Sequence, residues 1–332
     1  MAFVPNDMIE DLAIEILHLY QNVEVQILAS IADRLSKGMD SSQWDTIKLQ
    51  QVRIQQQEIK SIIDELDKVK PDQINKAAKI AYARGIEAAD NELSIKGALA
   101  QIDTAKVKAL AQATIFKLDG MVTPILRSAD DIYRRVITQS TQLMATGYKT
   151  RLQATQIALE RFSDSGVSAF IDKSGRRWTM PSYAEMATRT GFVQANLQGT
   201  TDRMNELDQD LCYVTEHPKE CEKCRPWEGK ILSMSGNNPN YPSLAEARDA
   251  GLFHPRCGHS MAIYIKGITE LPEKTSSPQL YEDGQKEKYL QRGVRQWEKR
   301  QAVAIDPDYK KAAEAKVKEW KQRLKEHKKA TK

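Results

Sequence analysis

The chain has 332 residues, of which 28% are charged and 7% aromatic, and its formal net charge at pH 7 is +4. With only 16 glycines and 12 prolines, the composition favours long, well-solvated helices over a large compact sheet. No apolar run approaches the roughly 20 residues that span a bilayer, which excludes a membrane-spanning protein. We expect a soluble protein of one to three domains.

The first half of the chain is predicted to consist of amphipathic helices. From about residue 7 to Ser36, apolar residues recur at three- and four-residue spacings, the period of one helix face. A helix boundary is expected before Pro71, because proline disfavours helical geometry in the residue that precedes it. Further helices are expected over residues 42–70, 72–97, 101–118, 124–147 and 150–162.

Shorter elements are predicted after Ser163. Residues 167–171 and 176–180 have the composition of strands and are separated by a glycine-containing turn, which predicts a β-hairpin. A capping-box pattern at Ser182 and Glu185 predicts the start of a helix. The pattern therefore changes from long helices to a mixed α+β arrangement near residue 163.

The segment from residue 211 to residue 265 is predicted to be a small β-rich module. Strands are expected near residues 211–215, 230–234 and 260–265, and Ser243 with Glu246 forms a second capping box at the start of a short helix. Such a module is too small to bury a large core, and a bound metal would contribute folding free energy.

This module contains all four cysteines of the chain and three of its five histidines. Cys221 and Cys224 form a C-x2-C pair, whose two thiolates can share one metal ion. We expect Cys257 and His259 to complete a tetrahedral zinc site, with a turn at Gly258 directing both side chains to the ion. A closed Cys3His shell would make this zinc structural, not catalytic. Alternative ligands are His254, His217 and Cys212.

Three other interpretations of the cysteines stay open. They can be small buried apolar residues. A disulfide is disfavoured, because no secretory signal peptide is recognisable. A thioredoxin-like redox pair requires a strand-to-helix setting, whereas Pro226 and Gly229 predict a loop after the pair.

The C-terminal region is strongly basic. Residues 281–332 contain 16 Lys and Arg against 9 Asp and Glu, a net charge of +7, and the other 280 residues have a net charge of −3. Asp306 followed by Pro307 predicts a helix start within this region. The basic surface is compatible with nucleic acid or an acidic protein face, and equally with ordinary solvated helices. It contains no aromatic-plus-basic motif of a known nucleic-acid module.

Several short motifs resemble the minor capsid proteins of tailed bacteriophages, relatives of the Mu F-like head morphogenesis family, of the phage minor capsid protein 2 type. The similarity covers about residues 150–300. The motifs that carry it are Arg225-Pro226-Trp227-x-Gly229-Lys230 after the cysteine pair, Gly251-x-Phe253-His254-Pro255-x-Cys257-x-His259, and Tyr281-x3-Gln285 at the start of an arginine-bearing helix.

The resemblance implies a non-enzymatic virion protein, present in few copies at the portal vertex and the capsid interior, that aids head assembly or DNA delivery. The implied partners are the portal protein and the major capsid or scaffold protein, with packaged DNA facing the basic tail and no membrane. Assembly would take place in the host cytoplasm. The predicted fold is mostly α, with an elongated helical arm (1–163), a mixed α+β domain with a zinc knuckle (164–275) and basic C-terminal helices (276–332).

Two enzymatic alternatives complete the predictions. A His-Asn-His nuclease would use His254, His259 and either Asn238 or Asn240 beside a divalent ion. An ADP-ribosyltransferase-like site would depend on Arg189 and Glu228. Neither alternative is supported by a local motif.

Overall fold

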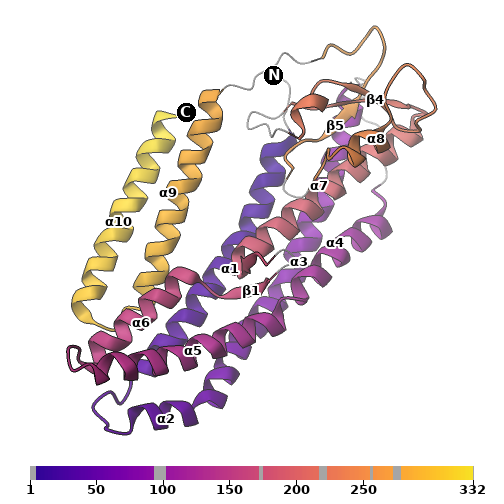
Figure 1. Ribbon diagram of the computed structural model, residues 1–332. Coiled ribbons are helices and arrows are strands. Elements are labelled where there is room, and N and C mark those ends of the chain that lie inside the picture. Colours follow the sequence, from indigo (N-terminus) through magenta and orange to yellow (C-terminus); the bar gives the residue numbers. More distant parts are fainter. Residues whose placement is uncertain are drawn as a thin grey trace. The chain divides into compact units, whose positions relative to one another are not determined.

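The computed structural model describes residues 5–92, 102–171, 175–216, 223–254, 257–271 and 278–331. These residues form mainly α-helices (Figure 1), which confirms the predicted fold class. None of the described helices is long and apolar enough to cross a membrane. The helices are α1 (Pro5–Ser36), α2 (Trp44–Gln50), α3 (Val52–Glu92), α4 (Thr104–Asp119), α5 (Val122–Ala145), α6 (Arg151–Ser165), α7 (Met180–Glu206), α8 (Leu244–Asp249), α9 (Pro278–Ala302) and α10 (Pro307–Ala330), with one 3-10 turn, η1 (Arg225–Trp227).

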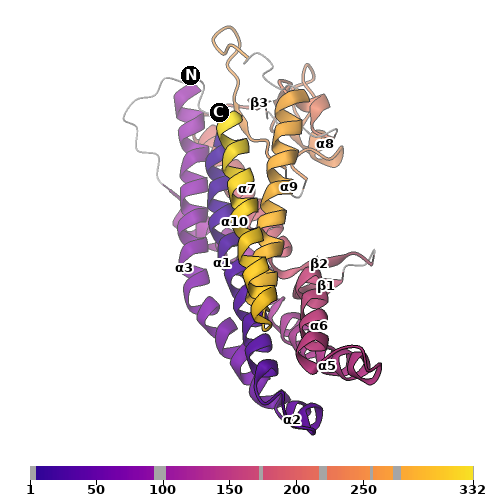
Figure 2. The ribbon, with the colours of Figure 1, turned by 90° about the vertical axis from the view of Figure 1, so that its left-hand side faces the viewer.

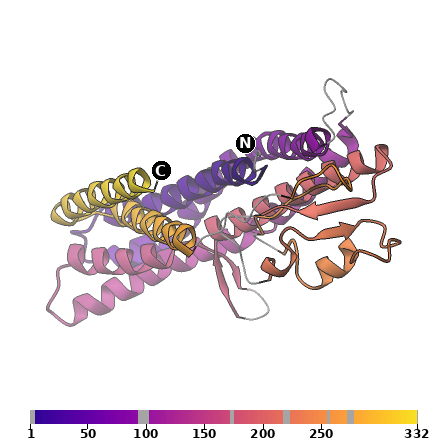
Figure 3. The same cartoon turned by 90° about the horizontal axis from the view of Figure 1, so that it is seen from above.

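Five short strands form two antiparallel sheets in the described chain. β1 (Ser168–Ile171) pairs with β2 (Arg177–Thr179), as the predicted hairpin requires. β3 (Leu211–Val214) is the central strand of the second sheet, between β4 (Ile231–Ser233) and β5 (Met261–Ile263). In Figure 3 the second sheet lies beside the C-terminal half of α7, from which β3 directly follows.

Side-chain caps define several helix starts. The Ser243 hydroxyl accepts from Glu246 N, and the Glu246 carboxylate accepts from Ser243 N, so this predicted capping box is formed. Asp306 caps α10 by accepting from Asp308 N and Tyr309 N. The sequence thus identifies these two helix starts through the polar groups that satisfy free backbone amides.

Three predictions about helix boundaries are wrong. The single helix expected over residues 42–70 is interrupted at Gln51, between α2 and α3. α3 continues through Pro71, because buried Leu66 and Ile74 on either side hold the helix in its packing. The Asn75 side chain donates to the Pro71 carbonyl at 2.8 Å. The capping box predicted at Ser182 is not a helix start, because α7 begins earlier, at Met180, with a proline in its first turn.

The chain divides into two compact units. Unit 1 comprises residues 1–16, 70–118 and 184–284, and unit 2 comprises residues 17–69, 119–183 and 285–332. Helices α1, α3, α7 and α9 therefore contribute residues to both units, and α4 ends one residue inside unit 2. The three-part domain division at residues 163 and 275 stays a prediction.

In unit 1, helices α3 and α7 approach so closely that only glycine fits at the crossing. A Cβ atom added to Gly85 would lie 2.0 Å from the Asn196 carbonyl oxygen, and one added to Gly199 would lie 2.1 Å from the Tyr82 carbonyl oxygen. Hydrogen bonds reinforce the contact, since the Thr200 hydroxyl donates to the Gly85 carbonyl at 3.1 Å. The two backbones are therefore fixed against each other.

In unit 2, α2 is fixed by buried polar contacts. The Trp44 indole donates to the Leu35 carbonyl at 3.1 Å, and the Tyr133 hydroxyl donates to the Lys48 carbonyl at 3.1 Å. Burial lowers the pKa of Lys48, whose ammonium group donates to the Arg34 carbonyl. Nearby, α1 and α3 lie side by side (Figure 2), and Gln55 donates to Ser30 at 2.9 Å.

We predict that Gly85→Ala destabilises the protein, although this substitution usually stabilises a helix by roughly 0.5–1 kcal/mol. The added methyl group meets backbone atoms that cannot rotate away, so we expect a loss of about 1–3 kcal/mol, measured by urea unfolding. Gly191→Ala provides the comparison, because its Cβ would meet the Thr114 side chain instead. Adding Thr114→Ala should relieve that clash. A Gly85→Ala variant more stable than the wild type would contradict the assigned crossing.

Candidate metal centre

Cys224 is positioned by a loop that is tied to the central strand of the second sheet. It immediately precedes η1, and its carbonyl accepts from Trp227 N at 2.8 Å. Gly229 has a positive φ of 69°, a conformation that glycine adopts without strain, and its N–H donates to the Val214 carbonyl at 3.0 Å. The described end of this loop, from residue 223 to residue 230, is therefore tied to β3, and Cys224 within it is fully buried.

A second loop, between α8 and β5, carries His254 and Cys257. Phe253 is buried and has a φ of 59°, which is unusual for a residue with a bulky side chain. A hydrogen bond from Cys257 N to the His254 carbonyl at 2.9 Å holds these two residues close together.

Three potential metal ligands meet between these loops. The ligand atoms of Cys224, His254 and Cys257 all lie within 4.8 Å of one another, and the two sulfur atoms are 3.6 Å apart. Both cysteines are buried, and the histidine is partly exposed. Two soft sulfur donors and an imidazole suit zinc and similar transition metals. We call these three residues the cysteine cluster; it could hold a metal ion.

His259 borders the cysteine cluster. Its Nδ1 atom lies 3.4 Å from the Cys257 sulfur, and its backbone N–H donates to the same sulfur at 3.4 Å. Residues 257–260 lie outside the turns and strands of the described chain, so the expected turn at Gly258 is not formed. None is needed, because side chains two residues apart in an extended segment point to the same side.

A buried carboxylate supports His259 from the far side of its ring. The Nε2 atom of His259 lies 2.6 Å from Glu228 Oε1, and both side chains are almost fully buried. Burial alone lowers the pKa of His259, but its contacts with Cys257 and Glu228 outweigh burial and raise it. Glu228 therefore sets the orientation of the ring and favours its positive charge. Sequence reasoning did not identify this role, because a glutamate in a predicted loop gives no local signal.

Cys257 in the cluster and Cys212 outside it are both buried, but their thiols have different pKa values. The Cys224 thiol and the His259 ring hold the pKa of Cys257 well below its usual range. By contrast, burial raises the pKa of Cys212 to about 12. Because metals bind the thiolate form, Cys257 is prepared for a metal and Cys212 behaves as an apolar core residue. Cys221 and His217, also predicted from the sequence, lie outside the described residues.

The residues of the enzymatic alternatives have other neighbours in the described chain. A cavity lined by Asn238 and Asn240 has no histidine among its described lining residues. Arg189 forms an ion pair with Glu10 at 3.4 Å, while Glu228 is buried against His259. These contacts give Arg189 and Glu228 structural roles.

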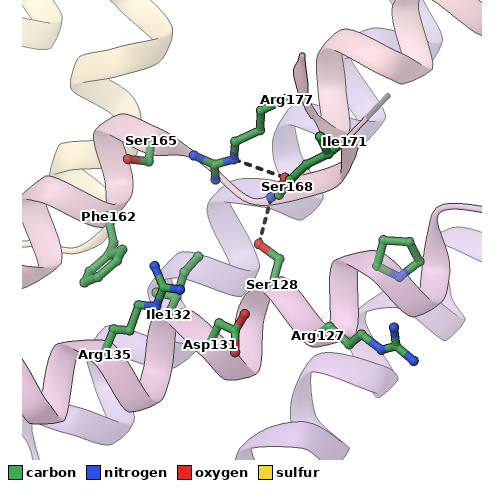
Figure 4. Close-up of a pocket in the computed structure, with 11 residues that line it drawn as sticks. Arg127, Ser128, Asp131, Ile132, Arg135, Phe162, Ser165, Ser168, Ile171 and Arg177 are labelled. Carbon is green, nitrogen blue, oxygen red and sulfur yellow. Dashed lines mark hydrogen bonds between the residues drawn. The ribbon is translucent and has the colours of Figure 1, made fainter. Parts of the chain in front are cut away.

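A separate cavity of about 610 Å³ lies in unit 2 (Figure 4). Its lining contains three arginines, Arg127, Arg135 and Arg177, and one carboxylate, Asp131. Arg177 already donates to the Ser168 hydroxyl at 3.1 Å, and Figure 4 shows the Arg127 side chain directed away from Asp131. The arginines therefore do not converge on one point, and we assign no ligand to this cavity.

Comparison with known families identifies the protein class. A family model matches nearly the whole chain, residues 4–329, and places it among the structural proteins of the bacteriophage head. The model is that of phage minor capsid protein 2, and the chain belongs to this family. This match confirms the resemblance found in the sequence. No curated protein and no solved structure matches the chain.

We predict that Glu228→Ala lowers the urea unfolding midpoint, since it removes the acceptor beside His259 Nε2. Loss of a buried charged partner should cost about 1–3 kcal/mol. Glu228→Gln, which retains an acceptor oxygen, should lose less, and Glu270→Ala, at an exposed position, serves as the control. An Ala variant as stable as the wild type would show that the contact with Glu228 does not hold the histidine.

Proposed function

We propose that the protein is a non-enzymatic component of the phage head that associates with the portal protein at the vertex, inside the capsid, and helps head assembly or DNA packaging and ejection. The family match over residues 4–329 carries this proposal. A place inside the capsid also suits the basic C-terminal region, which would face the packaged DNA. Contacts with the major capsid or scaffold protein belong to the same proposal.

We further propose that the cysteine cluster holds one structural zinc ion. The supporting observation is the convergence of two buried thiols and an imidazole within 4.8 Å. Cys221, which is separated from Cys224 by two residues, would supply the fourth ligand of a closed tetrahedral shell. Zinc in such a shell contributes to folding and leaves no coordination position for a substrate.

The histidine ligand is proposed to be His254. Its ring nitrogen lies within 4.8 Å of both thiols, whereas His259 is held between Glu228 and Cys257. In this arrangement His259 donates to the Cys257 thiolate and holds this ligand in place. Residues that hydrogen-bond to metal ligands commonly orient them in zinc sites. His259, chosen first from sequence spacing, is the alternative ligand.

Cys224→Ser should abolish zinc binding, measured as metal content per chain by mass spectrometry of the purified protein. We expect about one zinc in the wild type, as a single tetrahedral shell requires, and reduced protease resistance of unit 1 in the variant. Cys212→Ser is the matched control, because it changes a buried cysteine outside the cluster and should retain zinc. A folded wild-type protein without zinc would contradict the proposal.

The association with portal protein is tested by co-expression and affinity purification. We expect the portal protein to co-purify with the tagged wild-type chain, because the proposal places the two proteins in contact at the vertex. Major capsid protein expressed alone in a parallel sample controls for general adhesion. Lack of association with either portal protein or procapsids, with a folded protein, would overturn this part of the proposal.

A further inference from the structure

Helix α10 presents a row of lysines on its exposed face. Lys311, Lys318, Lys325 and Lys329 follow one another at spacings of seven, seven and four residues, and all four are exposed. On a helix with 3.6 residues per turn, these positions lie within about 40° of one another and span about 27 Å. We call these four residues the lysine row.

The packing of α10 directs the lysine row toward solvent. On its other face Ala313, Val317 and His327 are buried. The Trp320 ring contacts the Tyr289 ring of α9, with centroids 5.6 Å apart, and Figures 1 and 2 show the two helices side by side. Two interhelical ion pairs, Lys321–Glu298 and Lys328–Glu287, add to this contact. The orientation of α10 in unit 2 is therefore well determined.

The lysine row is not neutralised by ion pairs in the part of the chain that the structure describes. Among the described residues, none forms an ion pair with any of its four members, whereas Lys316 of the same helix pairs with Glu319 at 2.7 Å. Three carboxylates of the same helix, Asp308, Glu314 and Glu326, lie three or four residues from members of the row, and none of them forms an ion pair with it. Unit 2, which contains α10, is also positively charged as a whole. It contains 31 Lys and Arg against 21 Asp and Glu, a net charge of +10.

We propose that the lysine row binds the phosphate backbone of duplex DNA without sequence preference. Four unpaired ammonium groups in a line can each replace counterions condensed on the duplex, and the released counterions provide the binding free energy. The inference rests on the proposed function in one respect, because a protein inside the head would be exposed to packaged DNA.

The side chains around the row favour duplex DNA over other acidic partners. Ala315 and Gln322 share its face, and lysine is depleted at protein–protein interfaces, where aromatic residues and methionine are enriched. Single-stranded nucleic acid is bound mainly by stacking on aromatic rings, but Trp320 is packed against α9. Membrane binding by an amphipathic helix would require its apolar face, which α10 uses to contact α9.

The test measures binding of the full-length protein to a short mixed-sequence DNA duplex by fluorescence anisotropy, from about 50 to about 200 mM salt. Replacing all four lysines of the row with glutamine, a residue of similar helix propensity, should weaken binding at least about 100-fold at the lowest salt. The slope of log affinity against log salt should fall by about 3–4, since each phosphate contact contributes about 0.9.

A matched variant separates the lysine row from net charge. Replacing Lys76, Lys79, Lys108 and Lys117 with glutamine removes the same charge from exposed positions in unit 1 and should leave affinity and slope nearly unchanged. Equal losses in both variants, or no binding by the wild type, would overturn the proposal. Tighter binding to poly-glutamate or to anionic lipid vesicles than to DNA at the same salt would also overturn it. Zinc content and portal co-purification, measured on the same variant, show whether the proposed function stands independently.

Discussion

The contact between the backbones of α3 and α7 determines where the cysteine cluster lies. Glycine at the crossing allows the Asn196 side chain to reach across and donate to the Ala81 carbonyl at 3.2 Å. The same side chain accepts from the Ser260 hydroxyl at 2.6 Å, and Ser260 is the neighbour of His259. Because Ser260 also pairs with Thr215 at the end of β3, one buried amide connects the helix crossing, the sheet and the cluster. A shift of α7 along α3 would therefore displace the metal ligands.

A metal ion in the cluster would compensate for the small size of the sheet. Three strands of three or four residues bury little apolar surface, so they are not stable alone. The pair formed by Glu228 and His259 adds buried charge, which is costly unless every partner is satisfied. A cation bound by Cys224 and Cys257 would balance the negative charge of the thiolates and carboxylate together. The metal ion proposed for the cluster would therefore balance the buried charge of the module as well as add to its stability.

Local patterns in the sequence predicted local features well. Helical periodicity, the Ser243–Glu246 capping box and the Asp306 cap were correct because each depends on residues within one turn. The sequence also predicted that Cys224 and Cys257 lie close together, because ligands of one metal ion must meet at that ion. Features set by tertiary contacts were missed. Pro71 was expected to end a helix, and nothing near Glu228 in the sequence indicates its partner 31 residues later.

The division into units could not be predicted either, because each unit combines segments that are distant in the sequence. The division also separates charge, because the two units have net charges of opposite sign. The formal charge of +4 is the sum of +10 in unit 2 and −6 in unit 1, which contains 18 Lys and Arg against 24 Asp and Glu. Screening limits each charge to about 8 Å at physiological salt, so a partner responds to the unit it contacts and not to the net charge. A chain that is nearly neutral overall can therefore present a basic surface to a polyanion and an acidic surface to a protein, and the two properties can be changed separately.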